Sequence, residues 1–211
     1  MLDSVGWLDP DNDPTTPRIA KGVKGVPNGT PFEFSYLLVS ADAERPQAAE
    51  MIQESLAGCG IRMNIGLPSG TEYLAAGPEG EVFGRQFDMA QFALPLTLEP
   101  SCTLYVSGEI PGPYPEFPKG WGGANVSGYQ SSAFDLACQA ARFSLPDTPQ
   151  HQQAHFQAQA IFAEDLPALP LYLRPQVFVA RPDFCGVETD PSTSSVLWNL
   201  EQWDYGKECG K

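Results

Sequence analysis

Positive charge is scarce in this 211-residue sequence. Only 12 Lys and Arg residues face 26 Asp and Glu residues, so the formal net charge at pH 7 is −14. Binding to nucleic acid depends on Lys and Arg contacts with phosphates, and docking on anionic lipid needs the same positive charge. The composition therefore argues against both kinds of partner, and we interpret the acidic surface as a source of solubility.

Long apolar segments are also missing. No apolar run reaches the ~18 residues of a membrane-spanning helix. The first residues, Met1 to Ser4, include neither a basic region nor an apolar segment, so we expect no signal peptide in this chain. Two interpretations remain open: a cytoplasmic protein, or a chain that begins partway through a longer one.

The motifs of common catalytic and metal sites are incomplete. The two histidines, His151 and His155, have the spacing of a zinc protease helix, but Gln152 replaces the Glu that would act as general base. The glycines at 123 and 128 have the spacing of a phosphate-binding loop, but Tyr129 stands where Lys is required. No Gly-x-Ser-x-Gly elbow occurs. We therefore expect no catalytic residue, no metal ligand and no cofactor.

What the sequence does contain is a strand–helix–strand pattern in its first half. Residues 32–39 alternate and then become apolar, which predicts a strand. Residues 46–58 predict a helix, with Ala49, Ile52 and Leu56 at helical spacing, and residues 61–65 predict the next strand. Such a unit indicates a parallel strand pair joined by a helical crossover.

The second half mixes predicted helices with irregular chain. A short helix over 71–76 and a third strand over 87–94 precede a long stretch, 95–129, rich in Gly and Pro. Loops of this length in a compact domain are usually functional or flexible. Two helices are predicted over 132–143 and 149–164, followed by strands over 169–173 and 177–180. The second helix would have Phe156, Ala160 and Ala163 on one apolar face.

The five cysteines are scattered and form no Cys-x-x-Cys pair, which argues against a zinc ribbon or a thioredoxin-type site. One or two disulfides would suit an exported protein, and with an odd number at least one thiol is free or pairs outside the chain. Cys102 and Cys138 flank most of the long loop and the start of the helix after it. From position alone we predict a disulfide between them, which would stabilise the fold by ~2–4 kcal/mol.

Several segments, in this order, resemble the C-terminal half of the peptide- and nickel-type (family 5) extracytoplasmic solute-binding proteins of ABC importers. The segments are Leu2-Asp3-Ser4-Val5-Gly6-Trp7, Pro31-Phe32-Glu33-Phe34, Gly60-Ile61-Arg62-Met63-Asn64, Phe87-Asp88-Met89-Ala90, Glu99-Pro100, Gly128-Tyr129 with Phe134-Asp135, and the stretch from Ala158 to Leu171. Their shared order covers nearly the whole chain, which makes the resemblance more specific than any single segment.

The resemblance implies an α/β fold: a periplasmic binding protein-like II lobe with a mixed sheet flanked by helices. Family members are more than twice as long and hold their ligand in a cleft between two lobes. Residues 1–168 would form the C-terminal ligand-binding lobe, and 169–211 would supply closing strands and a tail that return to the other lobe. The absent leader would then reflect truncation, and the protein would be periplasmic or at the cell surface.

The resemblance also indicates a binding site. The cleft face of this lobe would include the end of the third strand and the loop after it, and the predicted ligand-binding residues are Ala93, Leu94, Pro95, Leu96, Thr97, Trp121 and Asn125. Peptide binders of the family often place an Asp near Leu96 to pair with the ammonium group of the ligand, and this chain departs from that pattern. Loop packing for Trp121, and core packing for Leu94 and Leu96, are the open alternatives.

We therefore expect a non-enzymatic component of an ABC importer that captures peptides or similar small solutes. Its partners would be a small-molecule or peptide ligand and the permease subunits of the transporter. The main alternative is a hydrolytic enzyme with carboxylates in the 95–129 loop, and a third is a free-standing interaction domain that uses its sheet edges.

Overall fold

The computed structural model describes residues 1–40, 43–94, 101–173, 177–190, 193 and 195–206. The chain divides into two compact units, of which the first comprises Met1–Leu94 and Thr103–Ser132. The second comprises Pro95–Cys102 and Ala133–Lys211. Both therefore draw on separated parts of the sequence, because the 103–132 segment belongs to the first unit.

A three-stranded parallel sheet is the centre of the first unit. Its strands are β3 (Glu33–Leu38), β4 (Arg62–Gly66) and β5 (Met89–Gln91), in the order β4-β3-β5. Both β4 and β5 pair with β3 in parallel. Helix α1 (Glu44–Ala57) connects β3 to β4, which confirms the predicted parallel pair with its helical crossover.

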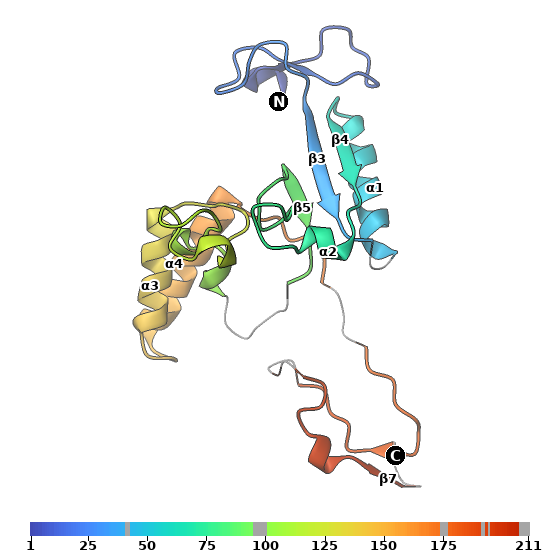
Figure 1. Cartoon of the computed structure of the whole chain (residues 1–211), viewed down its shortest axis with the longest axis vertical. Helices are drawn as coiled ribbons and strands as arrows, with labels where there is room; N and C mark the ends of the chain where they lie inside the picture. Colours follow the sequence, from blue (N-terminus) through green and yellow to red (C-terminus); the bar gives the residue numbers. More distant parts are fainter. Residues whose placement is uncertain (41–42, 95–100, 174–176, 191–192, 194, 207–211) are drawn as a thin grey trace. The chain divides into compact units, whose positions relative to one another are not determined.

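Helix α1 covers the β3–β4 part of this sheet, and the helix and strands lie alongside one another (Figure 1). Ala49 is fully buried against Tyr36, Leu38 and Met63, and Ile52 and Leu56 pack on the same cluster. The helical face predicted from the sequence is therefore the face that is buried. Burial of this apolar surface stabilises the unit by ~25 cal/mol for each Å² removed from water.

Short elements surround the sheet. Strands β1 (Trp7–Leu8) and β2 (Ile19–Ala20) form an antiparallel pair, and helix α2 (Gly70–Tyr73) begins at a capping box formed by Ser69 and Glu72. Short 3-10 turns occupy Asp3–Val5, Cys102–Leu104, Ser107–Glu109, Gly120–Gly122 and Leu200–Gln202. Two-residue strands have too few positions to show a hydrophobic period, so the sequence did not predict the β1–β2 pair.

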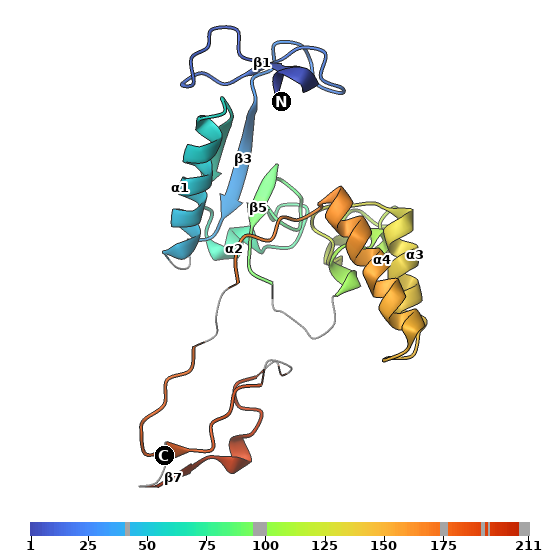
Figure 2. The same ribbon diagram turned by 180° about the vertical axis from the view of Figure 1, so that it is seen from behind.

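Helices α3 (Ser132–Phe143) and α4 (Pro149–Asp165) lie side by side (Figure 2). The predicted apolar face of α4 is wrong, because Phe156, Ala160 and Ala163 are exposed, Phe156 to 63%. The buried positions are Ala154 and Ala158, one turn apart. The structure therefore buries a different side of α4 from the one that the apolar pattern predicted.

The described parts of the C-terminal segment correct a second prediction. No strand forms within 169–173 or 177–180, and the apolar side chains there are exposed. A strand requires a hydrogen-bonded neighbour, and the structure describes none for these residues. Instead, β6 (Phe184–Cys185) pairs antiparallel with β7 (Asp204–Tyr205).

The α/β fold class is confirmed. Parallel and antiparallel pairing both occur, but in separate sheets: the β4-β3-β5 sheet is parallel, and β1–β2 and β6–β7 are antiparallel. In the part of the chain that the structure describes, every helix is too short or too polar to cross a membrane.

Candidate functional site

The carboxyl ends of the parallel strands meet at one edge of the first unit. The register pairs Leu37 with Gly66 on one side and with Ala90 on the other, so β4 and β5 end at nearly the same level. With strands ~4.8 Å apart, the residues that follow β4 and β5 leave the sheet ~10 Å from each other. In open α/β sheets, ligands bind outside the carboxyl ends of the strands.

This carboxyl edge is apolar and exposed. Leu67 follows β4, and Phe92, Ala93 and Leu94 follow β5, and all four are exposed. The exposure of Leu94 argues against its alternative role as a core residue in the described structure. Pro95, Leu96 and Thr97 lie outside the described residues, so their ligand contacts stay a prediction, as do those of Ala93 and Leu94.

The sequence analysis did not single out Leu67. The signal was present, because Leu67 comes just after the predicted strand 61–65 and the strand–helix–strand unit implied parallel pairing. Parallel strands bring their carboxyl ends to one edge, so a residue after the second strand belongs beside the segment after the third.

Asp88 fixes the start of β5 on β3. Its Oδ2 accepts hydrogen bonds from the backbone N–H of Ser35 (2.8 Å) and from the Ser35 hydroxyl (2.7 Å). In return, the backbone N–H of Asp88 donates to Ser35 Oγ (3.1 Å). The hydrogen bond from the Ser35 N–H, followed by that from its hydroxyl, lowers the pKa of the Asp88 carboxyl.

Asn125 holds the 103–129 loop together. Its Nδ2 donates to the backbone oxygens of Val106 (3.0 Å) and Tyr129 (2.9 Å), and its Oδ1 accepts from the Ser127 hydroxyl (2.8 Å). The residue is fully buried. Both amide N–H groups are therefore already used within the loop, and in this arrangement they have no capacity left to donate to a ligand.

Trp121 packs on the backbone at Gly77. A Cβ placed on Gly77 would collide with the six-membered ring of the indole, so only glycine allows this approach. A further contact joins the same two parts of the chain, because the Arg85 guanidinium lies 5.4 Å from the centroid of the Phe117 ring. Trp121 therefore packs within the loop region, which was the alternative left open from the sequence. Its side chain is only half-buried, so a ligand contact through its exposed surface stays a prediction.

The carboxylates that would carry the enzymatic alternative are Glu99, Glu109 and Glu116. Glu99 lies outside the described residues. Glu109 forms an ion pair with Lys119 (3.6 Å), and Glu116 is exposed. Neither described carboxylate has a buried partner of the kind that marks a general acid or base.

The histidines and other metal-binding residue types do not gather into a larger site in the described structure. His151 and His155 touch each other on α4, with ring centroids 4.6 Å apart. Among the described residues, no group of three or more His, Cys, Asp and Glu side chains is arranged to hold a metal ion.

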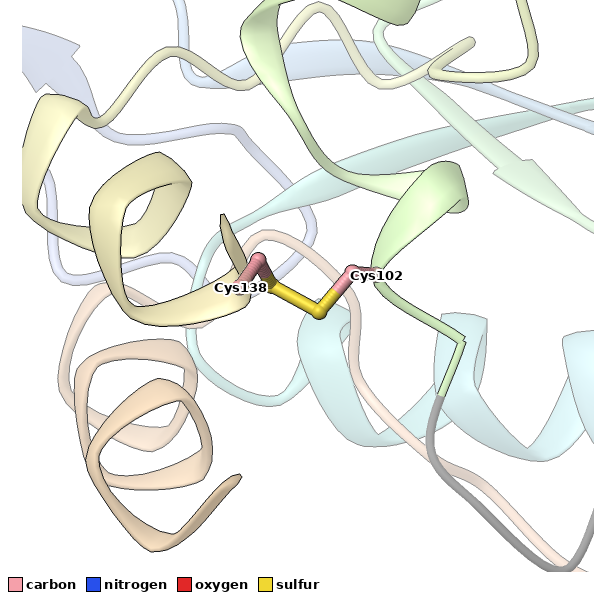
Figure 3. Close-up of a disulfide and its surroundings, with 2 residues drawn as sticks. All are labelled: Cys102 and Cys138. Atoms are coloured by element: carbon pink, nitrogen blue, oxygen red, sulfur yellow. A yellow bond between two sulfur atoms is a disulfide. The ribbon is translucent and has the colours of Figure 1, made fainter. Parts of the chain in front are cut away.

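The predicted disulfide between Cys102 and Cys138 is present (Figure 3). Its Cα atoms are 5.8 Å apart, within the usual range for a disulfide, and it links residues 36 positions apart in the sequence. Cys138 belongs to α3, so the bond attaches the beginning of the 102–129 loop to that helix. Cys185 is also disulfide-bonded, and Cys59 is a free and exposed thiol.

Comparison with known proteins gives one kind of match. No family model matches the chain, and no curated protein does. Among solved structures, an oligopeptide-binding protein of Thermus thermophilus in complex with a pentapeptide aligns with a TM-score of 0.64 and 23% identity, over 82% of this chain and 28% of its own. An oligopeptide-binding protein of Bacillus subtilis in complex with a nonapeptide aligns with a TM-score of 0.66 and 20% identity, over 98% of this chain and 36% of its own.

A third match extends the range of bound ligands. A periplasmic oligopeptide-binding protein of an ABC transporter from Thermotoga maritima, bound to mannohexaose, aligns with a TM-score of 0.67 and 20% identity, over 94% of this chain and 35% of its own. All three are described as oligopeptide-binding proteins. The chain spans about a third of the length of these structures. The resemblance stated from the sequence is therefore confirmed for the fold: this chain has the fold of one part of the periplasmic oligopeptide-binding proteins.

Proposed function

We propose that this chain is the ligand-binding lobe of a family 5 solute-binding protein that captures peptides or similar small solutes for an ABC importer. The observation that carries the proposal is the likeness of 82–98% of the chain to three proteins whose solved structures hold a pentapeptide, a nonapeptide or mannohexaose. The exposed carboxyl edge of the parallel sheet supports it, because this is where α/β folds bind small ligands.

The proposed contacts come from the predicted site with one addition. Ala93 and Leu94, with Pro95–Thr97 after them, would line the cleft face, and Leu67 would extend it beyond β4. Trp121 would offer the exposed part of its indole, an apolar surface suited to a peptide side chain or a sugar ring. Asn125 would act indirectly, by holding the loop that carries Trp121.

The remaining proposals concern the whole protein. A second lobe would close the cleft, and residues 169–211 would return to it. The protein would act outside the cytoplasm, in the periplasm or at the cell surface, and deliver its solute to permease subunits. No described feature favours the hydrolytic alternative over this function.

A thermal-shift screen tests the proposal. The 211-residue chain and a longer form that contains it would be heated with di- to pentapeptides, oligosaccharides and nickel chelates. A ligand at 100 times its dissociation constant stabilises a protein by about 2.7 kcal/mol, which is a readily measured shift. A shift in the longer form only supports a two-lobe binding protein and identifies the ligand class. A shift in the short chain alone, or in neither form, would contradict the proposal.

A further inference from the structure

Two tyrosines hold the last residue of β5 from different sides. The Tyr73 hydroxyl donates to the backbone oxygen of Gln91 (2.9 Å), and the Tyr36 hydroxyl donates to Gln91 Oε1 (3.2 Å). Gln91 is only 8% exposed, so both of its carbonyl groups are bound away from bulk water. The next residue along the chain, Phe92, begins the exposed segment of the carboxyl edge.

The strand itself offers little to fix this point. β5 has three residues and pairs, within the described structure, only with β3. Gln91 lies opposite Leu38, at the last position of the ladder. Strand ends fray readily because few hydrogen bonds hold them. The two side-chain hydrogen bonds to Gln91 therefore contribute substantially to holding the end of β5 in place.

The Tyr73 hydroxyl is itself held in a defined place. The residue ends α2, whose first turn is fixed by the Ser69–Glu72 capping box, and its side chain is 2% exposed in a cluster with Val82 and Val126. Burial raises the pKa of the Tyr73 phenol to about 12, so the hydroxyl keeps its proton and remains a donor at all ordinary pH values.

We propose that Tyr73 and Tyr36 are positioning residues for ligand binding: by holding Gln91 they fix the direction in which Phe92, Ala93 and Leu94 leave the sheet. The inference rests on the proposed function, because these three residues begin the segment proposed to line the cleft. A pre-ordered segment binds more tightly than a mobile one, since less conformational freedom is lost on binding.

The test compares Tyr73→Phe and Tyr36→Phe with the control Tyr114→Phe, whose side chain is 78% exposed. Each Phe variant keeps the ring and removes only the hydroxyl. Amide hydrogen exchange measured residue by residue is the first readout. Loss of one hydrogen bond should speed exchange in β5, which pairs with β3, about fivefold in each of the two variants, with less than twofold change in β4 and none in the control.

The second readout is the dissociation constant of the tripeptide alanyl-leucyl-alanine for the longest form of the protein that contains this chain. We expect affinity to fall about fivefold in Tyr73→Phe and Tyr36→Phe and to be unchanged in the control. Unchanged exchange in β5, or an equal rise in β4, would overturn the positioning role. If the wild-type protein does not bind the tripeptide, peptide capture is contradicted, whereas the exchange data still decide the role of the tyrosines. Should Tyr73→Phe fail to fold, Tyr36→Phe and Gln91→Ala give the same comparison.

Discussion

Removing the Cys102–Cys138 disulfide should destabilise the protein measurably. The bond closes a loop of 36 residues, and the chain-entropy relation for a loop of that length gives about 4 kcal/mol at 25 °C. Disulfides commonly contribute less than this relation predicts, so we expect the double variant Cys102→Ala/Cys138→Ala to lose about 2–4 kcal/mol. The physical reason is that the unfolded chain regains the freedom of the loop that the bond had closed.

Urea unfolding followed by far-ultraviolet circular dichroism measures the effect. With a slope near 2 kcal/mol per molar urea, the expected loss lowers the midpoint by about 1–2 M. Cys59→Ala is the matched control, because Cys59 is a free and exposed thiol and surface substitutions usually change stability by less than about 0.5 kcal/mol. Substitution is preferable to a reducing agent, which would also break the disulfide of Cys185.

The reasoning would be refuted if the double variant and the Cys59→Ala control unfolded at the same urea concentration. Alkylation of the oxidised protein followed by mass spectrometry gives an independent check. If Cys102 and Cys138 were both alkylated without reduction, the bond and the tether it provides would not exist in solution.

Three further predictions concern the sheet edge and the loop. Asn125→Ala should lower the free energy of unfolding by about 2 kcal/mol, because it removes the hydrogen bonds that the fully buried amide makes to Val106, Tyr129 and Ser127; an unchanged urea midpoint would contradict the role of the amide. Gly77→Ala should displace the indole of Trp121, and the resulting change in tryptophan fluorescence should disappear in a Trp121→Phe background. Hydrogen bonds from Ser35 lower the pKa of Asp88 in the folded state below its ordinary value of 3.8. The ionised carboxylate therefore stabilises the folded protein at pH values above 3.8, and this stabilisation is lost as the pH falls below 3.8. Between pH 6 and pH 3 the wild-type protein should therefore lose more stability than Asp88→Asn, and equal losses would show that the carboxylate contributes nothing.

Hydrophobic periodicity predicted the helices and the central sheet well. The buried face of α1, with Ala49, Ile52 and Leu56, was correct because its apolar residues recur at helical spacing and all face one sheet. The same reasoning failed for α4, where Phe156 is exposed and Ala154 and Ala158 are buried. Periodicity identifies which residues share a face of a helix, but the tertiary structure decides which face is covered.

The candidate site was predictable only in part. The segment after β5 could be identified because a strand precedes it, but Leu67 required the parallel register that places the end of β4 beside it. An Asn in a Gly-rich loop looks in the sequence like a group available to a ligand. Only the structure revealed that backbone carbonyls at Val106 and Tyr129 take both N–H groups of Asn125.

The sequence by itself determined the α/β character of the chain, the helical crossover and the likeness to solute-binding proteins. These features depend on residue type and on the spacing of residues close together in the sequence. Tertiary structure alone decided that Tyr73 and Tyr36 converge on Gln91, that Gly77 receives Trp121, and that 169–173 and 177–180 remain unpaired where they are described. Each of these contacts joins residues that are distant in the sequence. Such long-range partners produce no periodic pattern of residue types from which they could be predicted.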